Sequence, residues 1–145
     1  ATAKNIELHG YGNWYAFCVN EWGTKWDVGA DCQRNEIVGN TFNASFESAW
    51  GPPIQAYEKL EGLGFTVSAY YYECGMGFCG VFSEGVDDYF DITDMSSADV
   101  ADLLPNVLDE MIGIYENIAE WEQENEEEND TPHEFNTEGK FTVEK

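Results

Sequence analysis

The sequence predicts an α+β fold, because two kinds of apolar spacing follow one another along the chain. Residues 41–50 alternate apolar with polar side chains, which is the period of a half-buried strand. Residues 53–63 instead place Ile54, Tyr57 and Leu60 three positions apart, as on one face of a helix. Further segments repeat these two patterns in turn, so we expect strands and helices to share a core.

The order of the expected elements indicates a particular sheet. The expected strands cover residues 6–8, 26–32, 41–50, 65–73, 78–82 and 89–92, and the expected helices cover residues 11–22 and 53–63. Asn35 or Gly39-Asn40 is expected to supply the turn before the third strand. The first six elements read βαββαβ, an antiparallel sheet with two helices on one face, and a hairpin extends it. The sequence therefore predicts a ferredoxin-like sheet.

Trp50 stands at the corner between the third expected strand and the helix that follows it. Gly51 ends the strand, and Pro52 and Pro53 have no N–H to donate to a sheet. Proline suits the first turn of a helix, where that N–H would be unpaired in any case. We expect the large Trp50 indole to fill the end of the core.

Residues 96–128 are expected to be helical. Ser96 and Asp99 have the spacing of a capping box, and Pro105 predicts that a short helix ends near Leu103 before a second one begins. The second helix carries an apolar stripe made of Val107, Met111, Ile114, Ile118 and Trp121. Such a stripe predicts a helix that covers the open face of the sheet in a monomer or, in the alternative, pairs with its mate in a homodimer.

Negative charge is concentrated in the second half of the chain. The protein has 29 acidic and 6 basic side chains, for a net charge of −23. Residues 1–83 hold nine acids and four bases, whereas residues 84–145 hold twenty acids and two bases. We therefore divide the chain into a ferredoxin-like domain at residues 1–95, C-terminal helices packing on it at residues 96–128, and an acidic tail or edge strand at residues 129–145.

Three stretches of sequence resemble the YubB ferredoxin-like domain family of phages and conjugative plasmids. They are WYAFCVNEWGTKWD at residues 14–27, FESAWGPP at residues 46–53 and YYYECGMGFCG at residues 70–80. The resemblance covers about residues 5–83, with Gly51 in place of the usual Ser and Cys74 in place of the usual Pro. It implies a ferredoxin-like fold, a mobile-element origin and a bacterial cytoplasm, and it supplies no reaction.

No cofactor, metal or membrane contact is expected from the motifs present. Gly75 to Gly80 matches G-x-G-x-x-G, but it lies between two strands rather than before a helix. Cys74 and Cys79 give two thiols where a zinc site needs four ligands. The four cysteines are expected to be free thiols in a reducing cytoplasm, and no signal peptide or apolar run of membrane length is visible.

The favoured hypothesis is a non-catalytic protein whose acidic face imitates DNA. An excess of acid argues against direct binding to nucleic-acid phosphates and favours a basic partner, such as a DNA-binding host protein or a host defence enzyme. Duplex DNA carries about one charge per 1.7 Å of axis, and a helix rises about 1.5 Å per residue. The carboxylates expected to contact the partner are Asp109, Glu110, Glu116, Glu120, Glu122, Glu124, Glu126 and Glu127.

The alternative hypothesis is a small-ligand binder or an enzyme of unknown class. Its pocket would be lined by Trp22, Lys25, Trp26, Trp50 and Tyr72. Convergent aromatic residues suit a small ligand, although an ordinary core explains the same residues. No serine, cysteine and histidine constellation accompanies them, so a nucleophilic mechanism lacks a base.

Overall fold

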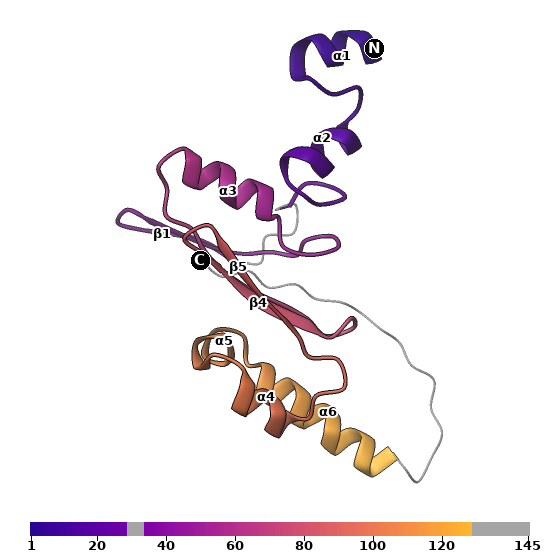
Figure 1. Cartoon of the computed structure of the whole chain (residues 1–145), viewed down its shortest axis with the longest axis vertical. Coiled ribbons are helices and arrows are strands. Elements are labelled where there is room, and N and C mark those ends of the chain that lie inside the picture. The colour runs from indigo at the N-terminus through magenta and orange to yellow at the C-terminus, as the bar shows by residue number, and fades with distance from the viewer. Residues whose placement is uncertain (29–33, 129–145) are drawn as a thin grey trace.

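The computed structural model describes residues 1–28 and 34–128, and it has an α+β fold with two antiparallel sheets. The helices are α1 (Thr2–His9), α2 (Trp14–Glu21), α3 (Ile54–Gly62), α4 (Ser97–Leu103), α5 (Asn106–Ile112) and α6 (Ile114–Glu128). The strands are β1 (Arg34–Val38), β2 (Thr41–Ser45), β3 (Ser68–Glu73), β4 (Phe78–Ser83) and β5 (Val86–Asp91). α3 lies on one side of the β3-β4-β5 sheet and α4–α6 lie on the other (Figure 1).

Much of the middle of the chain folds as its sequence pattern predicts, although β1 at residues 34–38 lies outside the strands expected there. β1 and β2 form a hairpin around Gly39-Asn40, with Val38 paired to Thr41 and Gly39 at φ 60°. Two-residue hairpin turns favour residues that accept positive φ, which explains the glycine. The expected helix at residues 53–63 and the expected strands at residues 65–73, 78–82 and 89–92 are confirmed, each to within a few residues.

Side chains of β3 alternate between two cores. Ala69 and Tyr71 face α3, whereas Tyr70 and Tyr72 face the C-terminal helices. The first core consists of the buried residues Tyr57, Val67, Ala69, Tyr71, Phe78 and Phe82. The second core consists of the buried residues Cys79, Ile92, Val100, Leu104, Leu108 and Ile114. Because successive residues of a strand point to opposite faces, one three-stranded sheet serves both cores.

The C-terminal helices begin as expected and then break at a glycine. Ser96 and Asp99 form the expected capping box. Gly113 adopts φ 72° and ends α5, so the single long helix expected after Pro105 is wrong, and α5 and α6 take its place. Glycine enters the left-handed region without steric cost, and the apolar stripe of the sequence carries no sign of that break. The expected edge strand at residues 129–145 lies outside the described residues.

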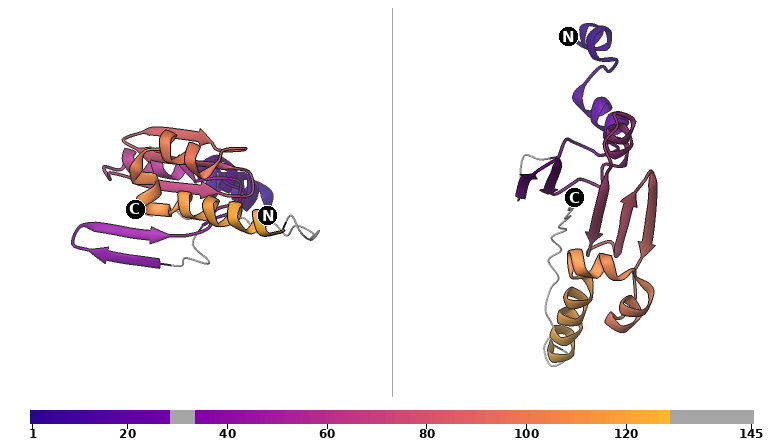
Figure 2. Two further views of the ribbon diagram at one scale, coloured as in Figure 1. Left: turned by 90° about the horizontal axis from the view of Figure 1, so that it is seen from below. Right: turned by 90° about the vertical axis from the view of Figure 1, so that its left-hand side faces the viewer.

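The strand expected at residues 6–8 is wrong, because these residues belong to α1. That helix ends at Gly10, which has φ 79° and donates its N–H to the Ile6 carbonyl oxygen. A strand satisfies its backbone only beside another strand, whereas a helix closes its hydrogen bonds within itself. Two alternating apolar residues are too few to decide between the two. α1 buries none of its residues and lies at one end of the molecule (Figure 2).

The ferredoxin-like topology is not confirmed. Of the strand expected at residues 26–32, residues 26–28 lie in an irregular bend, and residues 29–32 lie outside the described residues. The strand expected at residues 41–50 ends at Ser45. β2 pairs with β1, and no ladder joins this hairpin to β3 in the part of the chain that the structure describes. Two separate sheets therefore stand where one was expected.

Trp50 lies at the expected corner but does not fill the core. Its side chain is 58% exposed and meets the Tyr15 ring edge-on, with centroids 6.4 Å apart. The backbone of Trp50 has φ 73°, a left-handed conformation that a bulky residue rarely adopts. Ser48 closes the corner by donating its hydroxyl to the Gly51 carbonyl oxygen at 2.6 Å. The backbone path of this corner therefore turns the indole outward.

Candidate functional site

Helix α6 carries most of the carboxylates predicted to bind a partner, and one of its faces is fixed to the body. Ile114 is fully buried and Ile118 packs on the second core. The Glu122 carboxylate accepts hydrogen bonds from the Ser97 N–H at 2.9 Å and from the Ser97 hydroxyl at 2.6 Å. These bonds join α6 to the first turn of α4, and they hold the pKa of Glu122 below its usual value. The helix is thus a positioned scaffold rather than a free arm.

Two of the predicted acids, among those whose side chains the structure describes, have structural partners inside the protein. Glu122 binds Ser97, and Asp109 accepts a hydrogen bond at 2.7 Å from the N–H of Tyr115 in the first turn of α6. This bond satisfies one of the N–H groups that a helix start leaves unpaired. Both residues therefore stabilise the arrangement of the C-terminal helices, which sequence spacing alone did not reveal.

The remaining predicted acids face solvent where their side chains are described. Glu110 on α5 is exposed, as are Glu116, Glu120, Glu124 and Glu126 on α6. The side chain of Glu127 lies outside the described residues. Glu116, Glu120 and Glu124 are four residues apart, so they form one row about 6 Å apart on the helix surface. This row, which we call the acidic row, lies away from the buried Ile114 and the partly buried Ile118.

The negative charge of α6 destabilises the helix itself. Its sequence places seven carboxylates in 15 residues, or about one per 3 Å of helix axis. Like charges four residues apart destabilise a helix by about 0.2–0.5 kcal/mol per pair, and acids near a helix C-terminus oppose the helix dipole. Residues 97–128 contain no Lys, Arg or His to offset this. Residues that lower the stability of their own helix are typical of a functional surface.

The five residues of the alternative pocket do not come together. Trp22 lines a groove on the α3 side of the sheet, whereas Tyr72 faces the second core on the opposite side. Lys25 lies over the Trp26 ring at 4.8 Å from its centroid, and that indole is half exposed. Trp50 points outward. Spacing along the sequence gave no sign that the sheet separates Trp22 from Tyr72.

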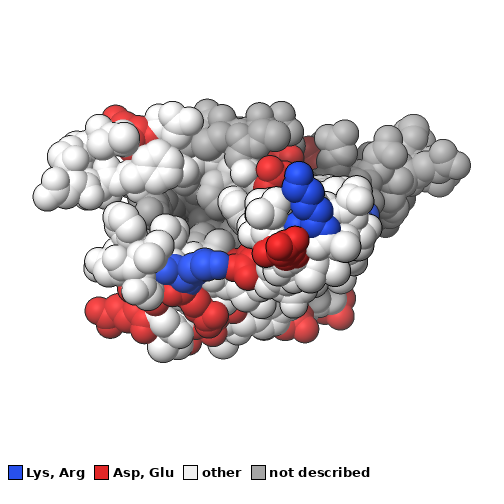
Figure 3. All heavy atoms as spheres, turned by 90° about the horizontal axis from the view of Figure 1, so that it is seen from above, with Lys and Arg blue, Asp and Glu red and all other residues white. Residues whose placement is uncertain are grey.

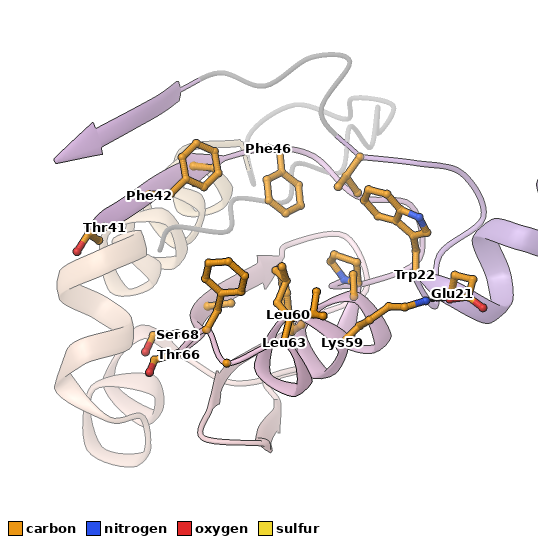
Figure 4. Close-up of a pocket in the computed structure, with 18 of the residues that line it drawn as sticks. Glu21, Trp22, Thr41, Phe42, Phe46, Lys59, Leu60, Leu63, Thr66 and Ser68 are labelled. Atoms are coloured by element: carbon orange, nitrogen blue, oxygen red, sulfur yellow. Dashed lines mark hydrogen bonds and ion pairs between the residues drawn. The ribbon is translucent and has the colours of Figure 1, made fainter. Parts of the chain in front are cut away.

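A different apolar groove lies between the β1–β2 hairpin and α3, and we call it the hairpin groove (Figure 4). Its volume is about 980 Å³. Phe42 and Phe46 reach in from the hairpin side, and Leu60 and Leu63 line the opposite wall (Figure 4). The alternation of residues 41–50 predicted an apolar face here, but not that this face would stand apart from the sheet.

The rim of the hairpin groove carries both signs of charge. Lys59 forms an ion pair with Glu21 at the end of the groove near Trp22 (Figure 4). Seen from the α1 end, the molecule shows a few basic side chains among acidic ones and a largely uncharged surface (Figure 3). This side of the molecule therefore differs from α4–α6, where every charged side chain is acidic.

The described residues offer little to hold a metal or to act as a nucleophile. Among them, no group of three or more His, Cys, Asp or Glu side chains is placed to bind a metal ion. Cys18 and Cys79 are free thiols, and burial raises the pKa of Cys79 to about 12. A thiol with so high a pKa stays protonated at neutral pH and is a poor nucleophile. Cys32 lies outside the described residues.

No helix within the described ranges combines the length and the apolar character needed to cross a membrane. Comparisons of the chain with protein-family models, with curated proteins and with solved structures gave no match.

Proposed function

We propose that this chain is a non-catalytic binding protein whose α6 carboxylates engage a basic partner in place of DNA. The observation that carries the proposal is the acidic row, Glu116, Glu120 and Glu124, held on a helix whose opposite face is anchored by Ile114 and by the Glu122–Ser97 hydrogen bonds. Carboxylates on a positioned helix lose less freedom on binding than those on a flexible tail, which favours affinity.

The charge density of α6 supports the comparison with DNA. Each strand of duplex DNA carries about one charge per 3.4 Å, and α6 has about one carboxylate per 3 Å of its axis. No cation in residues 97–128 neutralises these carboxylates. The partner class that fits is a basic, DNA-binding protein of the host cell. The resemblance to the YubB ferredoxin-like domain family adds a reason to propose a phage or plasmid protein, acting in a bacterial cytoplasm against a host defence.

Affinity capture with a DNA competitor tests this proposal. The immobilised chain is expected to retain DNA-binding proteins from a bacterial lysate at about 0.05 M salt and to release them at about 0.5 M, because screening shortens the reach of exposed charges. Added duplex DNA is expected to release the same proteins at low salt. If no DNA-binding protein is retained at low salt, or if DNA releases none of them, the proposal is wrong.

A second candidate function rests on the hairpin groove. Its volume of about 980 Å³ and its mostly apolar walls match small-molecule sites, which span about 300–1,000 Å³. Such a site would take an apolar ligand that is neutral or cationic, since Lys59 is already paired with Glu21 and the chain is strongly acidic. This keeps the small-ligand hypothesis, with Trp22 as the residue it shares with the pocket expected from the sequence.

Thermal denaturation with apolar ligands tests the second candidate. A ligand of the groove is expected to raise the melting temperature in step with its concentration, because binding to the folded state alone stabilises it. Leu60→Ala, in the groove wall, is expected to remove that rise. A rise that persists in Leu60→Ala would place the ligand elsewhere.

A further inference from the structure

A second groove lies beside α6, and its walls come from three parts of the chain. The β3–β4 turn, the segment between β5 and α4, and one side of α6 enclose about 880 Å³. The apolar part of its lining includes Met76, Met95, Ile118 and Trp121. The residues of this lining that carry a charge are Asp94 and Glu122, both acidic. We call it the turn groove.

Met76 presents an exposed side chain from a turn that is firmly held. Its side chain is 75% exposed. The buried Glu73 carboxylate accepts hydrogen bonds from the N–H groups of Gly75, at 3.1 Å, and of Met76. The Thr93 hydroxyl donates to the Met76 carbonyl oxygen at 3.3 Å. The thioether therefore projects from a fixed backbone, which reduces the entropy lost when a partner contacts it.

Trp121 presents the second large apolar group, from the opposite wall. Its indole is 56% exposed although α6 is anchored one turn earlier by Ile118. The neighbouring Glu122 is held by Ser97, so this part of the helix is positioned too. Exposed tryptophan and methionine on rigid elements are typical of residues that dominate binding energy at interfaces.

The charge around the groove selects among occupants. Asp94 is exposed, has a left-handed backbone (φ 62°), and forms no hydrogen bond or ion pair with the described residues. The acidic row lies on the same helix as Trp121. A second copy of this chain would bring another −23 charges to the surface, which disfavours self-association here. A cationic occupant meets complementary charge instead.

We propose that the turn groove binds a basic segment of the partner through apolar side chains, with Trp121 and Met76 as its anchors. A lysine or arginine side chain lays its aliphatic stem along the thioether and the indole while its charge approaches Asp94 or the indole face. A leucine of the same segment fills the apolar floor near Ile118. This inference rests on the proposed function and adds to it, because the acidic row supplies attraction and the turn groove supplies specificity.

Two labelled peptides of equal length and charge test the inference on the full chain. One alternates lysine with leucine and the other alternates lysine with serine, and binding is followed by fluorescence anisotropy at about 0.15 M salt. The lysine–leucine peptide is expected to bind about tenfold more tightly. Trp121→Ala and Met76→Ala are each expected to remove most of that difference, as loss of an interface anchor costs about tenfold or more.

The matched control is Trp14→Ala, which removes an indole 64% exposed on α2. It is expected to change neither affinity by more than about twofold, since its exposed side chain lies away from the turn groove. Circular dichroism of every variant verifies that it is folded. If the two peptides bind equally, or if Trp121→Ala acts no more strongly than Trp14→Ala, the inference is overturned.

The outcomes also separate this inference from the proposed function. Replacing Glu116, Glu120 and Glu124 with glutamine is expected to weaken both peptides alike. If that triple variant weakens the binding of both peptides but Trp121→Ala weakens the binding of neither, the acidic row is supported as a binding surface and the turn groove is not the binding site. If binding of the lysine–leucine peptide depends on Trp121 and not on the three glutamates, the turn groove is supported and the proposed role of the acidic row is wrong.

Discussion

The two faces of the β3-β4-β5 sheet are built by the same strands but differ in what covers them. The first face is covered by α3, which stands between β2 and β3 in the chain, and the second by α4–α6, which follow the last strand. Around the first face the surface carries both signs of charge, with Lys59 paired to Glu21. On α4–α6 every charged residue is acidic.

This difference distinguishes the residues that stabilise the fold from those proposed to bind a partner. Both cores are closed by ordinary apolar packing, so neither needs the charge of α6 for its burial. The carboxylates of the acidic row lie outside the second core and lower the intrinsic stability of their helix. The C-terminal helices carry these destabilising carboxylates although residues 97–128 contain no cationic side chain to neutralise them. Their surface is therefore the better candidate for contact with another molecule.

The largest expected effect comes from opening the second core. Leu108→Ala is expected to lower the free energy of unfolding by about 2–5 kcal/mol, because the side chain is fully buried and leaves a cavity. Urea denaturation measures it, with Leu63→Ala, at an exposed position, as the control within about 0.5 kcal/mol. A loss below about 1 kcal/mol in Leu108→Ala would mean that the C-terminal helices do not seal this face.

How well the sequence predicts each face depends on how far apart in the chain the interacting residues lie. The first face is largely local: the period of β3 and the stripe of α3 sit close together in the chain, and both were expected. The division of the sheets depends on which strands pair, a long-range choice that the period of a strand does not encode. Gly113 and the Ser97–Glu122 bonds likewise depend on tertiary contacts, so the long helix was expected unbroken and Glu122 was expected free.

A smaller effect distinguishes two tyrosines of the first core. The Tyr71 hydroxyl donates to Asp87 at 2.7 Å, joining β3 to β5 across β4, whereas the buried Tyr57 hydroxyl has no hydrogen-bond partner among the described residues. Tyr71→Phe is expected to lower the free energy of unfolding by about 1–2 kcal/mol. Tyr57→Phe is expected to leave it unchanged or to raise it, because no hydrogen bond is lost.

Chemical denaturation of the two phenylalanine variants is the measurement. Each removes one oxygen from the same core, so each serves as the control of the other. Equal losses of unfolding free energy in both variants would mean that the Tyr57 hydroxyl has a hydrogen-bond partner and that the first face is held together by a different set of hydrogen bonds.

The smallest expected effect is a dependence of the second face on pH. The Ser97 hydrogen bonds lower the pKa of Glu122, so their stabilisation is present above the pKa of an unfolded glutamate, about 4.3, and is lost as pH falls through the lower folded value. Glu122→Gln is expected to lower the melting temperature at pH 7 and to converge on the unmodified protein near pH 3. A constant difference from pH 7 to pH 3 would show that the carboxylate charge does not contribute to the contact.

We expect the position of the acidic row, and not net charge alone, to produce binding to a basic partner. Two triple variants of equal net charge test it: Glu116, Glu120 and Glu124 to glutamine on α6, and Glu7, Glu47 and Glu58 to glutamine, all exposed and away from α4–α6. Affinity for a DNA-binding protein captured by the chain is measured for both at about 0.1 M salt. Affinity is expected to fall about tenfold or more for the α6 variant and less than about threefold for the other, because salt screens interactions between exposed charges beyond about 10 Å. Equal losses in the two variants would mean that net charge alone produces the binding.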